Sequence, residues 1–165
     1  MRKIVFLLFI IISIVCIANN KKELLIPKEA IRIRVIANSN SIEDQKIKSD
    51  IKSDVSNFLA MKLFNVDNYQ DANNIIQNNI DDVKKIIEKY TNNYEINYGK
   101  NMFSEKEYKG VKYSEGIYNS IVIKLGDGDG NNFWCVLFPP LCLIDEEKND
   151  IEYAFLAKEL LNKVK

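Results

Sequence analysis

The stretch at residues 126–145 constrains the fold more than any other part of the chain. It begins with three alternating glycines, continues through the only tryptophan, Trp134, and reaches a Pro-Pro pair flanked by two cysteines. Glycine accepts positive φ, so this part is typical of a glycine-rich connection between two strands, 121–125 and 133–138. Because proline lacks the N–H that a strand needs, the second strand must end at Pro139. We therefore expect an apolar hairpin here.

Residues 1–18 have the pattern of a signal peptide. A short positive segment precedes an almost entirely apolar run at residues 4–18. That run is shorter than the ~20 residues of a membrane-spanning helix, and its small final residues favour cleavage after Ala18. The alternatives are an uncleaved anchor and lipidation at Cys16. Each alternative predicts that the bulk of the chain is exported and that it meets the membrane only through the leader.

Export makes Cys135 and Cys142 a candidate disulfide, because they form an even pair outside the reducing cytosol. If the chain stayed extended between them, their Cα atoms would lie roughly 20 Å apart, at ~3 Å per residue. A disulfide needs them within about 7 Å. A bridge therefore requires the Pro-Pro segment to fold back as a turn, which proline favours by fixing φ.

The composition excludes several classes of function. The chain has 23 basic and 23 acidic residues, and this balance gives no basic face for nucleic acid. It has no histidine, which removes Ser-His-Asp and Cys-His catalysis and the histidine zinc sites. We expect no cofactor and no metal. Residues 19–29 are interpreted as a linker, and residues 30–165 are enough for one domain.

The hydrophobic periodicity predicts an α+β fold. Residues 31–37 alternate as a strand does, and Ser41-Ile-Glu-Asp44 has the spacing of a helix N-terminal capping motif. Apolar residues then recur at three and four to about residue 64, and a second helix is expected at 70–90. Strand patterns follow, and Asp150 can cap a last helix. The expected order is β-α-α-β-β-β-β-α with a mainly antiparallel sheet.

Four carboxylates are the only candidates for acid–base chemistry that the sequence singles out. Asp127 and Asp129 lie in the glycine-rich segment, but the chain lacks the Gly and Glu that an EF-hand starting there would need. A solvated turn explains them better than calcium does. Asp44 and Asp145 lie beside tight turns, where capping and solvation explain them.

The apolar residues around the Pro-Pro pair are candidates for binding a partner: Phe133, Trp134, Leu137, Phe138 and Leu141. Alternation sends them to both faces of the strand. One interpretation is a central strand covered on both sides. The other is an exposed apolar face on which a partner docks. Composition alone does not decide between them.

Two stretches resemble the stage II sporulation protein R family. The first is Val35-Ile-Ala-Asn-Ser-Asn-Ser41 with Asp44-Gln45, and the second runs from the Gly-x-Gly-x-Gly-Asn segment through Trp-Cys-Val-Leu-Phe-Pro-Pro-Leu-Cys142. The resemblance spans roughly residues 31–145. The chain departs from the family pattern at Phe133, where a second Trp is usual, and at Arg34, where a His is usual.

The resemblance implies a signalling role in endospore formation. Proteins of this family are made in the forespore and exported into the space between the forespore and mother-cell membranes. There they trigger a membrane-embedded aspartic protease of the mother cell, which processes pro-sigma-E. We therefore expect a non-enzymatic ligand that acts by binding. The alternatives are an exported hydrolase of the cell envelope, built on the four carboxylates, and a structural envelope protein tethered by its leader.

Overall fold

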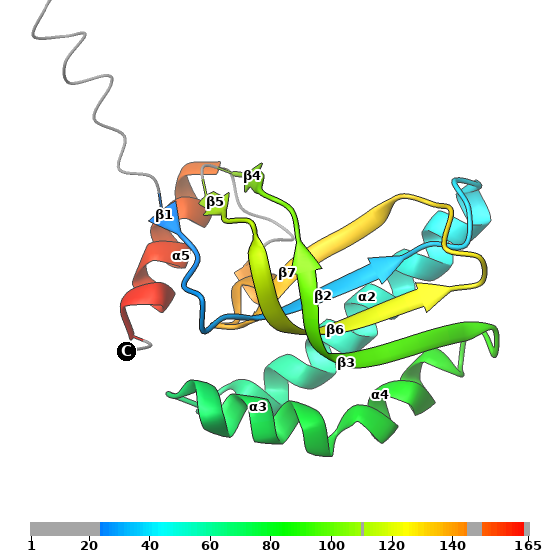
Figure 1. The fold of residues 1–165 in the computed structure, drawn as a ribbon, viewed down its shortest axis with the longest axis horizontal. Coiled ribbons are helices and arrows are strands. Elements are labelled where there is room, and N and C mark those ends of the chain that lie inside the picture. Colours follow the sequence, from blue (N-terminus) through cyan, green and yellow to red (C-terminus); the bar gives the residue numbers. More distant parts are fainter. Residues whose placement is uncertain (1–23, 110, 145–149, 164–165) are drawn as a thin grey trace, which may run out of the picture.

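The computed structural model describes residues 24–109, 111–144 and 150–163. Figure 1 shows the arrangement of the elements. In chain order they are β1 (Leu24–Leu25), β2 (Ile31–Ile36), α2 (Ile42–Leu63), α3 (Tyr69–Asn78), α4 (Ile80–Ile87), β3 (Tyr94–Phe103), β4 (Lys106–Tyr108), β5 (Val111–Tyr113), β6 (Gly116–Leu125), β7 (Asn132–Phe138), the 3-10 helix η1 (Leu141–Ile144) and α5 (Asp150–Lys163).

A four-stranded sheet with the strand order β3-β6-β2-β7 forms the centre of the fold. Its inner strands, β2 and β6, are parallel, and each outer strand pairs antiparallel with its inner neighbour. The expected α+β class with a mainly antiparallel sheet is confirmed. The expected hairpin of 121–125 with 133–138 is wrong. Strand β2 lies between β6 and β7 and pairs with both, so the glycine-rich segment crosses the end of β2.

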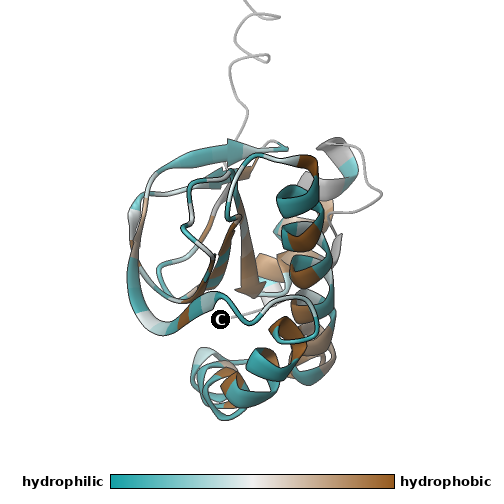
Figure 2. Ribbon diagram, turned by 90° about the vertical axis from the view of Figure 1, so that its right-hand side faces the viewer, coloured by the Kyte–Doolittle hydropathy of each residue, from teal (hydrophilic) through white to brown (hydrophobic). Residues whose placement is uncertain are grey.

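Helix α2 covers one face of this sheet and begins as the capping motif predicts. The Ser41 hydroxyl accepts a hydrogen bond from the backbone N–H of Asp44, which satisfies a donor that the first helical turn leaves free. Ile51, Val55 and Leu59 follow at four-residue spacing and are fully buried. Figure 2 shows the helices banded in brown and teal, as expected for helices with one apolar side.

The single helix expected at 70–90 is two helices, α3 and α4. They separate at Asn79, whose side-chain amide donates to the carbonyl of Ile75 and whose φ of −110° departs from helical geometry. The apolar spacing continues across this break, because Ile76 and Val83 are both fully buried in the core beneath α2. Periodicity alone therefore gave no sign of the break.

A smaller sheet, with the strand order β1-β5-β4, lies beside one end of the main sheet together with α5. The second apolar cluster is formed here: Ile26, Ala30, Phe103, Val111, Tyr113, Tyr118, Val136, Leu141 and Ala157. Part of the expected linker belongs to this unit, because β1 pairs with β5 and Ile26 is buried. The leader expected at residues 1–18 lies outside the described residues.

Candidate functional site

The five residues expected to bind a partner lie on or just after β7, at one edge of the main sheet. Leu137, Phe138 and Leu141 are buried, with exposed fractions of 2%, 0% and 0%. Phe133 and Trp134 are only partly buried. Of the five, therefore, only these two present surface. The strand is covered on both faces near its C-terminal end, but it is an edge strand and not a central one.

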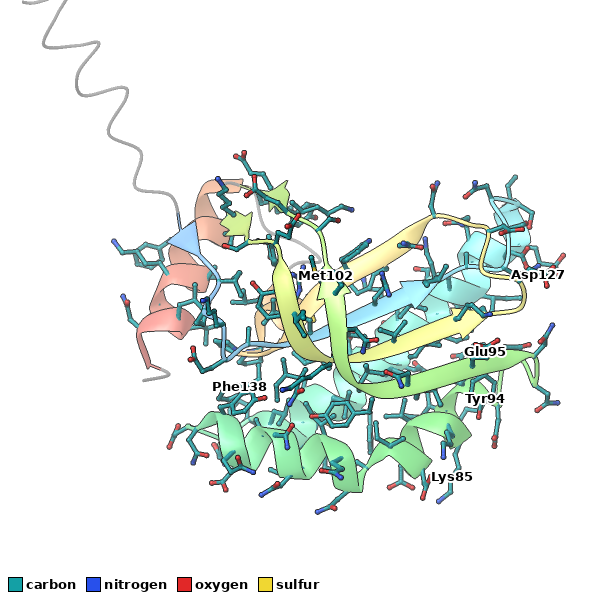
Figure 3. The ribbon with its side chains drawn as sticks, in the orientation of Figure 1. Lys85, Tyr94, Glu95, Met102, Asp127 and Phe138 are labelled. Atoms are coloured by element: carbon teal, nitrogen blue, oxygen red, sulfur yellow. A yellow bond between two sulfur atoms is a disulfide. The ribbon has the colours of Figure 1, made fainter. Side chains whose placement is uncertain are left out.

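A β-bulge explains why Leu137 and Phe138 both point into the core. Arg32 of β2 pairs with Val136, whereas its neighbour Ile31 pairs with Phe138, so Leu137 is the extra residue on β7. Both side chains join the core beneath α2. Figure 3 shows Phe138 above the helix layer, far from Asp127 at the other end of the sheet.

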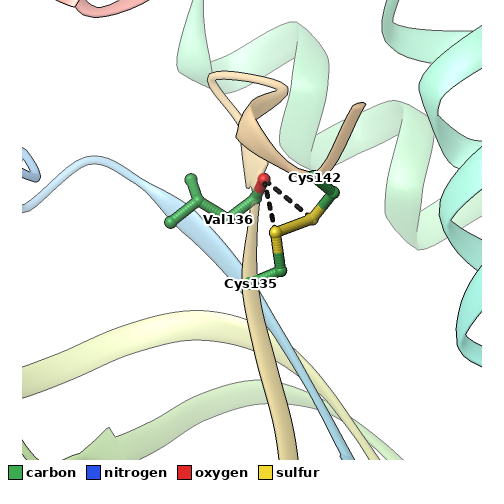
Figure 4. Close-up of a disulfide and its surroundings, with 3 residues drawn as sticks. All are labelled: Cys135, Val136 and Cys142. Atoms are coloured by element: carbon green, nitrogen blue, oxygen red, sulfur yellow. Dashed lines mark hydrogen bonds between the residues drawn. A yellow bond between two sulfur atoms is a disulfide. The ribbon is translucent and has the colours of Figure 1, made fainter. Parts of the chain in front are cut away.

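Cys135 and Cys142 form a disulfide in this structure (Figure 4). The turn after β7 brings their Cα atoms to 5.7 Å, with the backbone N–H of Leu141 donating to the Pro139 carbonyl at 2.7 Å. Both sulfurs lie against the carbonyl oxygen of Val136. The bridge ties η1 to β7 and so holds Leu141 in the second apolar cluster.

A layer of arginines and aromatic rings lies on the sheet face opposite α2. The guanidinium carbon of Arg32 is 4.1 Å from the ring centroid of Phe103 and 4.9 Å from that of Tyr118. The guanidinium carbon of Arg34 is 5.1 Å from the ring of Trp134, which meets Phe103 edge to face. Such cation–π contacts stabilise a charge that is partly removed from water.

Arg32 is the unusual member of this layer, because it is 1% exposed. Its Nε and Nη1 atoms are buried without a hydrogen-bond partner among the described residues, and so is Nε of Arg34. Burial lowers the pKa of Arg32 from its ordinary value, against smaller opposing effects of Tyr118 and Tyr113. A cavity of about 290 Å³ adjoins Arg32 and is also lined by Trp134, Lys106 and Tyr113. We call this the arginine pocket.

The arginine pocket was not foreseen from the sequence. The alternation of residues 31–37 correctly predicts that Ile31, Ile33 and Val35 share one face, and it places Arg32 and Arg34 on the other face. What covers that other face depends on β4, β5 and the end of β3, which are distant in sequence. The sequence signal that could have indicated the pocket is the presence of arginine at positions 32 and 34, since the chain has only three arginines among its 23 basic residues.

A second group of polar residues lies at the opposite end of the sheet, where residues 38–45 meet residues 126–131. We call it the loop cluster. Asn38 accepts from the backbone N–H of Asp127 through its side chain and from that of Asp129 through its carbonyl. Asn40 accepts from the backbone N–H of Asn131. These contacts fix the glycine-rich segment across the end of β2.

Asp44 holds the loop cluster together. Its carboxylate accepts from the Ser39 hydroxyl at 2.6 Å and from the Asn38 amide at 3.0 Å. These two hydrogen bonds lower the pKa of Asp44 from its ordinary value, with the Ser39 bond having the larger effect. Gly126 has a φ of +53°, and a side chain there would collide with Asn38. The network therefore requires both the carboxylate and the glycine.

The remaining carboxylates singled out by the sequence do not converge on a site. Asp127 and Asp129 use their backbone N–H groups to bind Asn38, and Asp145 lies outside the described residues. Within the described ranges, no group of three or more His, Cys, Asp or Glu residues is placed to hold a metal ion. None of the helices in the described part of the chain combines the length and hydropathy needed to span a bilayer.

The two stretches that carry the family resemblance therefore come together in space. Residues 35–45 and 126–142 pair as β2 and β7 and interlock at the loop cluster. A family model described as stage II sporulation protein R matches residues 27–148, which include both stretches.

Among curated proteins, the chain is similar to Stage II sporulation protein R of Bacillus subtilis (strain 168). The two are 36% identical over 133 residues, which cover 77% of this chain and 59% of the relative. The chain thus spans less than two thirds of that relative's length. No solved structure matches the chain. The family model and the relative together show that the chain belongs to the stage II sporulation protein R family.

Proposed function

We propose that the protein is an exported sporulation signal that triggers a membrane-embedded aspartic protease of the mother cell to process pro-sigma-E. Membership of the family supports a role in sporulation, and the family is named for sporulation and not for an enzymatic activity. The leader pattern of residues 1–18 supports export. The protein then acts by binding in the space between the two membranes.

The observation that favours a binding role over a catalytic role is the lowered pKa and the hydrogen bonding of Asp44. An acid–base catalyst needs a pKa near the working pH and an open path to its substrate. Asp44 instead has a lowered pKa and accepts from Ser39, from Asn38 and, through its backbone, donates to Ser41. Its carboxylate serves to hold two loops together, which is a structural role.

The surface of β7 that remains accessible supports a binding role. Phe133 and Trp134 are partly exposed on opposite faces of this edge strand, and each ring lies within reach of a cation. The ammonium of Lys52 is 4.9 Å from the Phe133 ring centroid, and that of Lys106 is 5.1 Å from the Trp134 ring centroid. Aromatic residues are enriched at protein interfaces, and tryptophan is among the residue types that most often dominate the binding energy there.

The test is co-expression of the full chain, with its leader, beside the cognate membrane protease and the pro-sigma factor in a non-sporulating host. Immunoblotting for the processed sigma factor gives the readout. We expect processing that depends on this chain and that falls at least tenfold with Trp134→Ala. Phe64→Ala, which truncates an exposed aromatic residue at the C-terminal cap of α2, is the matched control and should retain processing.

The same assay separates a ligand from an envelope hydrolase. A hydrolase built on Asp44 would lose orders of magnitude in activity with Asp44→Asn, a change that keeps the shape of the side chain. A binding protein should keep processing in this variant, provided that it is folded and exported. Absence of processing with all three proteins present and this chain exported would overturn the proposal.

A further inference from the structure

The arginine pocket contains a buried charge that lacks the partner such a charge normally has. Arg32 is 1% exposed, yet no described carboxylate forms an ion pair with it or with Arg34. Removing a charge from water without a counter-ion is costly, and buried arginines in proteins are usually paired. Among the described residues, Nε and Nη1 of Arg32 and Nε of Arg34 therefore lack an oxygen acceptor.

The surrounding rings hold the guanidinium in place, and a side-chain hydrogen bond with Tyr118 partly offsets the effect of burial on the pKa of Arg32, but Nε and Nη1 stay unpaired. Phe103 and Tyr118 lie against Arg32, and Tyr118 uses its own hydroxyl hydrogen to bind the Ser114 carbonyl. An aromatic face is only a weak partner for an N–H group. Nε and Nη1 of Arg32 and Nε of Arg34 accordingly remain as unsatisfied donors among the described residues.

The adjoining cavity has room for a ligand group. Its volume of about 290 Å³ is far above the roughly 15 Å³ that one water molecule needs. Arg32 and Lys106 contribute positive charge to its lining, and the exposed Glu107 contributes the opposite charge. Trp134 forms an apolar wall beside them. The charged residues of the lining thus have a surplus of one positive charge, which one acidic group would balance, and Arg34, which lies outside the lining behind Trp134, adds a further positive charge.

The presence of arginine at these positions, in a chain rich in lysine, also favours a site for an acidic group. The chain has three arginines, Arg2, Arg32 and Arg34, and every other basic residue is lysine. Arginine is preferred over lysine where a planar fork of N–H donors must match a carboxylate in a partly dry setting. Two of the three arginines lie in this one layer of the fold, and one of them, Arg32, lines the pocket.

We propose that the arginine pocket binds the carboxylate of an Asp or Glu side chain from an acidic peptide segment of a partner protein. A singly charged group suits a lining with so small a surplus of positive charge, and the partly exposed Trp134 gives the peptide an apolar contact beside the carboxylate. This inference does not depend on the proposed protease partner, because it concerns the pocket of the isolated protein.

The test measures binding to the purified full-length protein in a mild detergent, through the fluorescence of Trp134, the only tryptophan in the chain. The probe is the blocked peptide Ac-Ala-Glu-Ala-NH2, with the matching Gln peptide, acetate and inorganic phosphate as separate arms. We expect a saturable change with the Glu peptide and none with the Gln peptide. Equal responses to the Glu and Gln peptides, or tighter binding of acetate or phosphate than of the Glu peptide, would overturn the proposal.

A second readout observes the donors directly. With three arginines in the chain, the Nε–H signals of Arg32 and Arg34 can be assigned by nuclear magnetic resonance using single Arg→Lys variants. Saturation with the Glu peptide should shift at least one of these signals and slow its exchange with water, because a hydrogen bond forms there. Unchanged signals at saturation would contradict carboxylate binding by the arginines.

Variants complete the design. Arg34→Gln and Arg32→Met should each weaken binding of the Glu peptide by about tenfold or more, since each removes a charge-assisted hydrogen bond or its supporting charge. Lys106→Gln removes a positive charge from the lining of the pocket at an exposed position, where the substitution should not affect folding, and it should also weaken binding. Lys85→Gln, on the distant helix α4 (Figure 3), is the matched control and should bind as the unmodified protein does. Full binding by all three pocket variants would overturn the proposal.

Discussion

The polar groups at the two ends of the main sheet differ in whether they have hydrogen-bond partners. At the loop cluster, Asp44, Asn38 and Ser39 satisfy one another and the backbone of the glycine-rich segment. At the arginine pocket, Arg32 is more deeply buried, and its Nε and Nη1 donors lack acceptors in the part of the chain that the structure describes. The first arrangement is complete within the chain and serves the fold. The second is incomplete, which is expected of a site that awaits a ligand.

The largest effect should come from closing space inside the loop cluster. Gly126→Ala should lower the free energy of unfolding by about 2–4 kcal/mol, because alanine resists the positive φ and its methyl group displaces Asn38. Chemical denaturation measures this change. Gly99→Ala is the control, since the nearest atom to its added methyl group lies 3.9 Å away. A similar loss in both variants would show that the network does not account for the effect.

Loss of the helix cap should have a smaller effect at the same end of the sheet. Ser41→Ala removes the acceptor for the backbone N–H of Asp44 and should cost about 1 kcal/mol in the free energy of unfolding. Ser41→Asn, which can also cap, should recover most of that stability. If Ser41→Asn were no better than Ser41→Ala, the hydroxyl would be acting through something other than the cap.

The pH dependence of Asp44 provides a third and smaller effect. A carboxyl group whose pKa is lower in the folded state stabilises the fold above its unfolded pKa of about 4, and this stabilisation is lost as pH falls through the folded pKa. The unmodified protein should therefore be more stable than Asp44→Asn at pH 7, and the gap should shrink below about pH 4. Denaturation series at both pH values test this, and a gap that is constant with pH would contradict it.

The smallest change in stability is expected at the arginine pocket. Arg32→Met fills nearly the same volume without a buried charge, so its free energy of unfolding should be unchanged or higher. Thermal unfolding of this variant beside Gly126→Ala tests the comparison directly. A loss above about 3 kcal/mol in Arg32→Met would show that Arg32 already has a partner within the folded chain, and the contrast between the two ends would fail.

Local sequence patterns predicted the elements better than they predicted the partners of those elements. The strand at residues 31–37 and the helix capped by Ser41 were foreseen because their signals lie within a few residues. The insertion of β2 between β6 and β7 was not foreseen, since periodicity does not specify pairing. For the same reason, alternation placed Arg32 on a face but did not reveal the aromatic residues that cover it.

The candidate residues on β7 show the same limit. The sequence identified an unusually apolar segment, but it did not indicate that a bulge would bury both Leu137 and Phe138. It left the pairing of Cys135 with Cys142 open, because the direction of the turn at the Pro-Pro pair sets their separation. Of the five residues expected to bind a partner, only Phe133 and Trp134 are accessible at the surface, because the other three are buried.

The central place of β2 has a consequence for the order in which the protein folds. β2 leaves the ribosome long before its two neighbours, because β6 and β7 end at Leu125 and Phe138. The sheet therefore depends on contacts between residues distant in sequence, which are slow to form. A chain truncated before residue 132 would leave one edge of β2 open to pairing with other molecules. Folding of the sheet must therefore await synthesis of nearly the whole chain.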